Sequence, residues 1–285
     1  MKKKIKTAFV LSGGGSLGAA QVGMLKALAE LNVKPDVLIG ASVGALNAAF
    51  IAMNRWPDCV KDLEELWISI KRQDVFPLDI PALVSAIIGK RNYLIDSSGL
   101  RKIIRDNLRA ETFEECQIPL RVVVTEVLSG KVAIFSSGPL FEPLLASASI
   151  PGVFAPVEIN GIFYMDGGVS DNTPISDALN LGAKEVYVLP TSYGCEPEEV
   201  PNSAMGMFLH TSNLLVNQGF RRDLENNQSK AKLEILKAPC GIIQSSYDFS
   251  QTQALIQQSY EMTMTTIGPK LANKKVINKR IKSSF

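Results

Sequence analysis

Ser42 lies in a pattern that is typical of a nucleophilic serine. Residues 40–44 read G-A-S-V-G, which matches the G-x-S-x-G pattern of a serine held on a sharp turn between a strand and a helix. Such a turn projects the hydroxyl away from the backbone, and the residues two before and two after it must be small because they approach each other. We therefore expect Ser42 to be the nucleophile, with Gly40 and Gly44 as the motif residues that permit the turn.

A serine nucleophile also needs N–H donors that stabilise the oxyanion formed during attack. Gly13, Gly14 and Gly15 supply three consecutive backbone N–H groups with no side chains around them, directly before a predicted helix. The same stretch, completed by Gly18, also fits the G-x-G-x-x-G pattern of dinucleotide-binding proteins. That pattern expects an acidic residue at the end of the next strand, whereas Asp36 stands at its start. Nucleotide binding therefore stays as the alternative function of this loop.

The general base is a histidine or a carboxylate. His210 is the single histidine, and the chain order Ser42, Asp166, His210 is that of the α/β-hydrolases. Those enzymes build several strands before their serine, however, and His210 lies in the middle of a predicted helix, which favours a structural histidine. Asp166 follows a short strand and precedes Gly167 and Gly168, so we expect it to stand at a sheet end with open space around it. Other nearby carboxylates lack this context: Glu158, Asp171 and Asp177.

The elements around these residues follow from hydrophobic periodicity. Strands are predicted at 6–11, 36–41, 120–127, 131–135, 162–165, 185–189 and 232–236, and helices at 22–32, 43–53, 57–70, 98–108, 139–148, 173–181, 203–226 and 250–271. The first four elements alternate strand and helix, which implies two parallel strands joined by a right-handed crossover. Both glycine-rich turns then lie at the carboxyl ends of their strands, where open α/β sheets bind ligands. We expect the triple glycine and Ser42 to face each other.

Two segments are harder to interpret. Residues 76–95 contain prolines and many aliphatic side chains with weak periodicity, which is compatible with a lid, a groove wall or an irregular packed connection. Residues 197–202 are predicted to form a surface loop. With 285 residues, 46% of them hydrophobic, the chain can bury a large core. We expect a single domain over 1–285, with a core at about 6–189 and a C-terminal helical part at about 203–285.

Charge limits the class of partner. A net charge of +2 excludes a strongly basic nucleic-acid-binding protein, although the charge is uneven. Basic residues gather at both ends of the chain, where their ordinary role is solvation and their alternative role is contact with anionic lipid surfaces: Lys2, Lys3, Lys4, Lys6, Lys270, Lys274, Lys275, Lys279, Arg280 and Lys282. An inactive membrane-surface module that uses these ends together with Met205, Met207 and Phe208 is a further alternative.

The cysteines and the apolar segments bear on compartment. Cys59, Cys116, Cys195 and Cys240 are scattered and form no C-x-x-C pair, so we expect no zinc site and no disulfide, as in a reducing compartment. The apolar part of residues 1–11 is too short for a signal peptide. The apolar run 37–53 contains polar residues and glycines and is just under the length of a membrane span. We expect a cytoplasmic protein, with peripheral membrane contact left open.

At this point the sequence resembles the patatin-like phospholipases, a family of lipid acyl hydrolases. Four blocks carry the resemblance in order: 13–18 (G-G-G-S-L-G), 40–44 (G-A-S-V-G), 146–157 (A-S-A-S-I-P-G-V-F-A-P-V), and 166–168 (D-G-G) with 172–174 (N-T-P). The likeness spans roughly residues 6–189, about two-thirds of the chain. The family implies a three-layer α/β sandwich with a mainly parallel central sheet and helices on both faces.

The resemblance also implies a mechanism. Ser42 would be the nucleophile and Asp166 the base of a Ser–Asp dyad, with Gly14 and Gly15, helped by Gly13, as oxyanion donors. The activity would be cleavage of lipid acyl esters through an acyl-enzyme, without a metal or cofactor; acyl transfer on the same dyad is the alternative. Leu17 stands where the family often has Arg or Lys, which bears on head-group preference.

Overall fold

The computed structural model describes residues 5–77, 89–192, 200, 204–227, 230–241 and 246–282, without the side chains of 204–206, 208–210, 212–213 and 273–282. Several sequence-based expectations fall outside this description. These are most of the 76–95 segment, most of the 197–202 loop, Lys2 to Lys4, and the side chains of Met205, Phe208, His210 and the basic residues beyond 272.

A mostly parallel sheet forms the middle of the structure. Its strand order is β5-β6-β3-β2-β1-β7-β8, with β4 also paired to β3. The contacts from β3 through β2, β1 and β7 to β8 are parallel, and those of β3 with β4 and β6, and of β5 with β6, are antiparallel. The strands are β1 (Thr7–Leu11), β2 (Val37–Ala41), β3 (Leu120–Glu126), β4 (Val132–Phe135), β5 (Val157–Ile159), β6 (Ile162–Asp166), β7 (Glu185–Leu189) and β8 (Lys232–Ile235).

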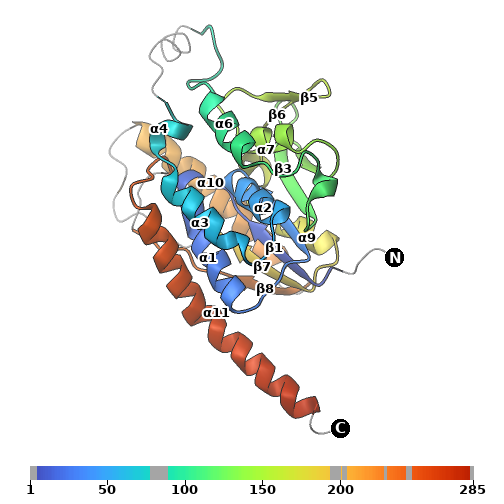
Figure 1. The fold of residues 1–285 in the computed structure, drawn as a ribbon. Helices are drawn as coiled ribbons and strands as arrows, with labels where there is room; N and C mark the ends of the chain where they lie inside the picture. Colours follow the sequence, from blue (N-terminus) through green and yellow to red (C-terminus); the bar gives the residue numbers. More distant parts are fainter. Residues whose placement is uncertain are drawn as a thin grey trace.

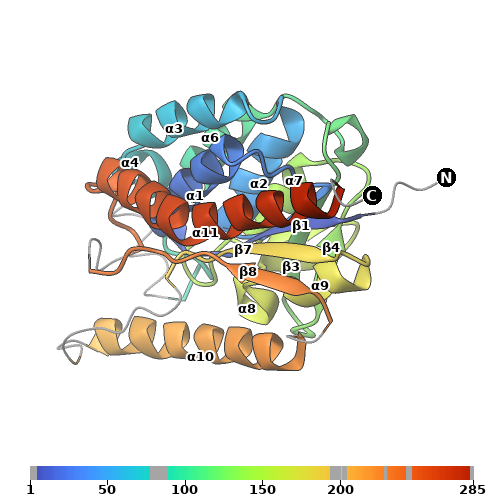
Figure 2. The same cartoon turned by 90° about the horizontal axis from the view of Figure 1, so that it is seen from below.

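Helices cover both faces of this sheet, so the molecule has three layers (Figure 1). Figure 2 shows α1, α2, α3 and α11 on one side of the sheet and α8, α9 and α10 on the other. The α-helices are α1 (Ala19–Glu30), α2 (Val43–Met53), α3 (Cys59–Ser69), α4 (Arg72–Val75), α6 (Ser98–Asn107), α7 (Phe141–Ser147), α8 (Gly168–Asp171), α9 (Ile175–Asn180), α10 (Ala204–Asn227) and α11 (Thr252–Lys282), and the 3-10 helices are η1 (Gly15–Gly18) and η2 (Phe113–Glu115).

The alternation of side chains along β1 divides the core in two. Phe9 and Leu11 belong to the larger cluster, under α1, α2 and α11, whereas Ala8 and Val10 belong to the smaller one, with residues of α9 and α10. Parallel strands between two helical layers are buried on both faces, so their sequences are continuous apolar runs. This arrangement confirms the predicted fold class and the parallel pairing of the first two strands.

The helix α11 differs from its prediction. The sequence predicts an end near residue 271, but the helix runs from Thr252 to Lys282, with Pro269 inside it. The residues after 271 include no glycine or proline that would stop a helix, so the prolonged helix is consistent with local propensity. Its first half packs closely on α1, since a Cβ on Gly23 would lie 2.0 Å from the Ile256 carbonyl oxygen. Figure 1 shows its C-terminal part extending beyond the sheet.

Two further expectations, on the cysteines and on the apolar run 37–53, have different outcomes in the structure. Cys59 and Cys116 are free thiols, but Cys240 is disulfide-bonded, so the expectation of unpaired cysteines is wrong there. The absence of a C-x-x-C pair in the sequence does not exclude a disulfide between cysteines far apart in the chain. The apolar run 37–53 divides into β2 and α2, and among the described residues every helix falls short of the length or the apolarity that a bilayer crossing requires.

The contact between α2 and β1 tolerates no side chain at Gly44. A Cβ there would lie 2.3 Å from the carbonyl oxygen of Leu11 and 2.5 Å from that of Ser12. We predict that Gly44→Ala lowers the free energy of unfolding by about 1–3 kcal/mol, as overpacking does, in chemical denaturation. Gly219→Ala is the matched control, because it lies inside α10 with nothing within 4 Å of the new Cβ. It should leave stability unchanged or raise it by up to about 1 kcal/mol; equal losses in both variants would contradict this packing argument.

Candidate active site

Ser42 stands on the turn between β2 and α2, where it is the N-cap residue of the helix. Its backbone has φ 54° and ψ −132°, a sparsely populated combination that costs on the order of 1–3 kcal/mol and persists only where the surroundings impose it. The turn is tight, since a Cβ on Gly40 would lie 2.5 Å from the carbonyl carbon of Gly44. The predicted geometry of this turn is therefore present.

The helix α7 holds this turn in place through Ser147. The N–H of Ser42 donates a hydrogen bond to Ser147 Oγ over 2.9 Å, and Ser147 Oγ donates to the carbonyl of Val123 over 2.7 Å. Ser147 is fully buried, so water does not compete for these bonds. The sequence placed Ser147 in one of the four blocks without giving it a role; the structure makes it the link between the turn and β3.

The hydroxyl of Ser42 meets the carboxylate of Asp166. Ser42 Oγ donates to Asp166 Oδ2 over 2.6 Å, across 124 residues of chain. Asp166 is the last residue of β6, and hydrogen bonds hold both its carboxylate and its backbone carbonyl. Its Oδ1 accepts from the N–H of Gly168 over 2.7 Å, and its carbonyl accepts from Thr125 Oγ1 over 2.8 Å.

Burial determines the ionisation of Asp166. Only 6% of the residue is exposed, and loss of solvation raises the pKa of its carboxyl to about 6, against the lowering effect of the hydrogen bonds from Ser42 and Gly168. An ordinary aspartate has a pKa near 4. The carboxylate is thus a stronger base than usual and is still mostly ionised at neutral pH.

The glycine loop lies against the serine, as expected. A Cβ on Gly13 would lie 2.9 Å from Ser42 Cβ and 2.4 Å from Asn172 Oδ1. The N–H of Gly13 already donates to the Asn172 carbonyl over 3.3 Å, so it is not free to donate elsewhere. Within the described part of the chain, the N–H groups of Gly14 and Gly15 donate to no protein acceptor. Gly15 also lines the same pocket as Ser42.

A buried polar chain supports the loop from below. Gln21 Nε2 donates to the carbonyls of Ser12 (2.8 Å) and Leu189 (2.9 Å), at the ends of two adjacent strands. Gln21 Oε1 accepts from Asn47 Nδ2 over 2.9 Å, and Asn47 Oδ1 accepts from Trp67 Nε1 over 2.8 Å. All these donors are satisfied by protein acceptors, and the three side chains are buried, which makes such a network rigid. The sequence analysis gave no role to any of these three side chains.

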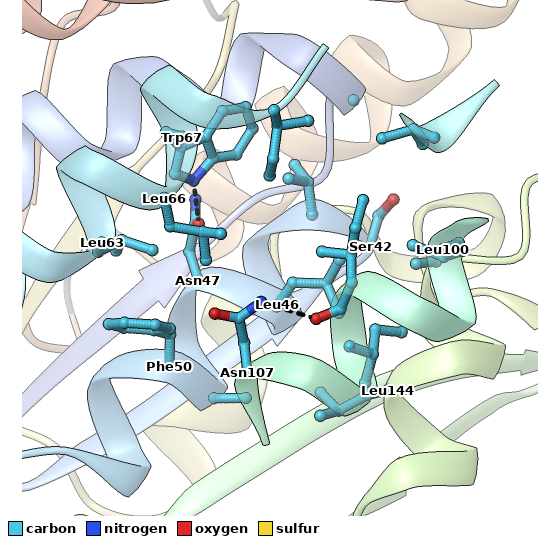
Figure 3. Close-up of a pocket in the computed structure, with 18 of the residues that line it drawn as sticks. Ser42, Leu46, Asn47, Phe50, Leu63, Leu66, Trp67, Leu100, Asn107 and Leu144 are labelled. Atoms are coloured by element: carbon cyan, nitrogen blue, oxygen red, sulfur yellow. Dashed lines mark hydrogen bonds between the residues drawn. The ribbon is translucent and has the colours of Figure 1, made fainter. Parts of the chain in front are cut away.

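Ser42 opens into an apolar pocket (Figure 3). The cavity has a volume of about 910 Å³, counted with its part open to solvent, and Figure 3 shows the labelled side chains of α2, α3, α6 and α7 around it. It follows the length of α2, from Val43 to Met53. Ten residues of helix rise by about 15 Å, so the pocket is elongated. Nearly all its lining is aliphatic or aromatic: Leu46, Phe50, Leu63, Leu66, Trp67, Phe76, Leu100, Ile104, Leu144, Ile150, Phe154 and Phe249 among others.

A C-terminal segment completes the pocket and the loop. The N–H of Ser16 donates to the Ser246 carbonyl over 2.8 Å. Phe249 stacks on Trp67 with ring centroids 6.2 Å apart, and Tyr247 packs edge-on against Phe76 at 5.0 Å. No sequence pattern indicates this contribution, because the segment precedes α11 and lies far from every motif.

The other candidate carboxylates do not reach Ser42. Asp177 forms a bidentate ion pair with Arg121, and Glu158 is exposed on the edge strand β5. Asp171 lies on α8, in the field of Asp223. His210 belongs to α10, with its side chain outside the description. Among the described residues, no cluster of His, Cys, Asp or Glu fits a metal ion.

Residues 9–179 match the family model described as patatin-like phospholipase. This chain belongs to the patatin-like phospholipase family. The matched region contains the glycine loop, the serine turn and the D-G-G segment, and it ends before the polar and aromatic contacts that β7 and the C-terminal segment add to the site.

Relatives of this patatin-like chain are distant. It is 28% identical over 187 residues to the patatin-like phospholipase domain-containing protein 7 of Rattus norvegicus, covering 64% of this chain and 13% of that protein. It is 30% identical over 179 residues to an uncharacterised NTE family protein of Mycobacterium tuberculosis, covering 62% and 47%. The chain thus spans about half the length of the mycobacterial relative and far less of the mammalian one.

The fold is also found in a solved structure of another protein. The crystal structure of VipD from Legionella pneumophila matches 92% of this chain and 66% of its own, with a TM-score of 0.50 and 15% sequence identity. At that identity the likeness concerns the fold alone. It agrees with the three-layer arrangement of the patatin-like chain in Figures 1 and 2.

The partly buried Asp171 makes stability depend on pH. Burial, and then the charge of Asp223, raises the pKa of its carboxyl to about 7, while the N–H of Thr173 lowers it. The folded state therefore holds a proton that the unfolded state releases near pH 4, so stability falls as pH rises from about 4 to 7. We predict that Asp171→Asn, which keeps an acceptor for Thr173, raises the melting temperature relative to wild type at pH 8 more than at pH 5. An identical difference at both pH values in thermal unfolding would contradict this assignment.

Proposed function

We propose that this protein is a serine-dependent lipid acyl hydrolase that cleaves carboxylic esters of fatty acyl groups. The observation that carries the proposal is the 2.6 Å hydrogen bond from Ser42 Oγ to Asp166 Oδ2, on a turn beside the glycine loop. A serine is nucleophilic only with a base in contact with its hydroxyl. Membership of a family named for phospholipases supports the substrate class.

The reaction has two steps on the same pair of residues. Asp166 accepts the proton of Ser42 as the hydroxyl oxygen attacks the ester carbonyl, and the protonated carboxyl then gives this proton to the departing alcohol. In the second step Asp166 takes a proton from a water molecule that attacks the acyl-enzyme, and Ser42 is restored as the fatty acid leaves. Each proton taken is returned, so the dyad needs no histidine.

Negative charge on the carbonyl oxygen needs donors that are in place before attack. We assign this role to the N–H groups of Gly14 and Gly15, which donate to no described acceptor. The N-terminus of α2, at Val43, adds a favourable helix dipole. Gly13 has a different part: its N–H is taken by Asn172, and its lack of a side chain admits Ser42 and Asn172.

The pocket favours a long acyl chain over a small polar acid. A fatty acyl group attached at Ser42 has an apolar channel along α2, lined almost entirely by aliphatic and aromatic side chains and by no charged side chain. Burial of such a chain is worth roughly 0.8 kcal/mol per methylene. The acyl group thus defines the substrate class. Transfer of the acyl group to an alcohol in place of water would use the same dyad, and analysis of the products distinguishes transfer from hydrolysis.

We predict that removing either member of the dyad abolishes ester turnover. Ser42→Ala and Asp166→Asn should each reduce kcat on a p-nitrophenyl acyl ester by roughly 10³-fold or more, as loss of a nucleophile or its base does. Ser42→Ala should also lose labelling by a fluorophosphonate probe. Asp171→Asn is the matched control, because it neutralises a nearby, partly buried carboxyl that does not contact Ser42. Turnover by Ser42→Ala at the wild-type rate would refute the proposal.

We predict that activity rises with pH through about 6. The base must be ionised to accept the Ser42 proton, and burial raises the pKa of Asp166 to about 6. A plot of log(kcat/KM) against pH reports groups of the free enzyme. It should therefore rise with unit slope below pH 6 and level off above it. Asp171→Asn should keep the same midpoint. If that variant moves the midpoint instead, the titrating group is not Asp166.

A further inference from the structure

Thr191 touches the glycine loop from outside the region that matches the family. It follows β7, two residues beyond Leu189, and it is 4% exposed. The family match ends at residue 179, so Thr191 comes from a part of the chain to which no motif was assigned.

Two hydrogen bonds join Thr191 to the loop. Its Oγ1 donates to the carbonyl of Gly13 over 2.6 Å, and its own N–H donates to Ser12 Oγ over 3.1 Å. The contact is also steric, since a Cβ on Gly14 would lie 2.2 Å from Thr191 Oγ1 and 2.6 Å from Thr191 Cβ. Gly14 has φ 156°, and the absence of its side chain lets Thr191 approach the backbone.

The bond to the Gly13 carbonyl has a consequence for the next N–H. In a planar trans peptide the carbonyl of one residue and the N–H of the following residue point in opposite directions. When Thr191 holds the oxygen of Gly13, the N–H of Gly14 must therefore point away from Thr191. This N–H is one of the two that donate to no described acceptor.

The neighbouring peptides of the loop are held by other groups. Gln21 holds the Ser12 carbonyl, and the N–H of the following residue, Gly13, is already taken by Asn172. The Gly14 carbonyl accepts a backbone bond from the N–H of Leu17 over 3.2 Å. Among the described side chains, Thr191 is thus the one bonded to the carbonyl of the peptide that supplies the Gly14 donor.

We propose that Thr191 is a positioning residue, whose hydroxyl orients the Gly13–Gly14 peptide so that the Gly14 N–H faces the developing oxyanion. The inference rests on the proposed hydrolase function and extends it beyond the region of the family match. It requires no contact between Thr191 and substrate. Without the hydroxyl, the buried Gly13 carbonyl loses its donor, and the peptide has no bond that opposes its rotation.

Three variants isolate the hydroxyl. Thr191→Val replaces it by a methyl group of similar volume, Thr191→Ser keeps it and removes a methyl group, and Thr263→Val is the matched control. Thr263 is also fully buried, but it lies on α11 and its hydroxyl has no hydrogen-bond partner among the described residues. The control therefore reports the effect of a buried Thr→Val change that breaks no bond.

The readout is the acylation rate constant for a p-nitrophenyl acyl ester, measured in single-turnover stopped-flow experiments. The steady-state KM is measured beside it. Loss of a whole oxyanion donor costs roughly 10²–10³-fold in rate. We expect Thr191→Val to slow acylation by about 10-fold or more with KM within about 2-fold of wild type, because the oxyanion contact exists only in the transition state. Thr191→Ser should stay within about 3-fold of wild type, and Thr263→Val should match it.

The outcomes separate the two proposals. If wild type shows no Ser42-dependent acylation, the hydrolase function fails. If wild type acylates and Thr191→Val does so at the same rate, or if Thr191→Ser is as slow as Thr191→Val, the positioning role fails. Should Thr191→Val not fold, Thr191→Ala is compared with Thr191→Ser instead, since neither adds bulk and only the serine retains a hydroxyl; equal rates in this pair overturn the inference.

Discussion

Gly40 and Gly44 have no side chains, so the first turn of α2 packs directly on the ends of β1 and β2. This close packing fixes the position of Ser42. Gly44 lies against the carbonyls of Leu11 and Ser12, and Gly40 lies against Gly44. With these contacts closed, the chain leaves β2 and enters α2 through a residue with positive φ, which is Ser42. The unfavourable backbone of one residue is thus imposed by the packing of a whole helix on the sheet. The hydroxyl is presented by the fold, and its position does not depend on the flexibility of a surface loop.

Asp166, the second member of the Ser42–Asp166 pair, lies at the end of a strand that runs opposite to β2 and β3. Because β6 runs antiparallel to β3 and β2 runs parallel to it, the end of β6 and the end of β2 do not meet at the same edge by strand polarity alone. The contact is made through the middle of β3, where Asp166 pairs with Val124 and Ser147 bonds to Val123. Adjacent residues of one strand therefore set the separation of Ser42 and Asp166. This explains a short, buried hydrogen bond between residues so far apart in the chain.

The sequence predicted those parts of the site that depend on local chemistry. The serine turn, the glycine loop and the D-G-G segment were found because glycine is needed wherever backbones approach closely, and that need is visible in residue type. Gln21, Asn47, Trp67 and Thr191 were missed, since a polar residue that bonds to a distant carbonyl resembles any other polar residue in sequence. The length of α11 and the disulfide at Cys240 were also mispredicted, because a helix end without a stop signal and a disulfide between cysteines far apart in the chain leave no local pattern.

The division between a motif and its support has a physical basis. Motif glycines permit a conformation but do not select it, because a residue without a side chain has the most backbone freedom to lose. Three consecutive glycines would leave the loop with many accessible conformations, of which few aim an N–H at the substrate. Selection must come from groups that hydrogen-bond to the loop backbone. In this chain Gln21 of α1 and Thr191, after β7, donate to loop carbonyls, and the carbonyl of Ser246 accepts from the N–H of Ser16. Two of these three supports lie beyond the region that matches the family. A segment that carries no recognisable motif therefore decides how well the motif is ordered.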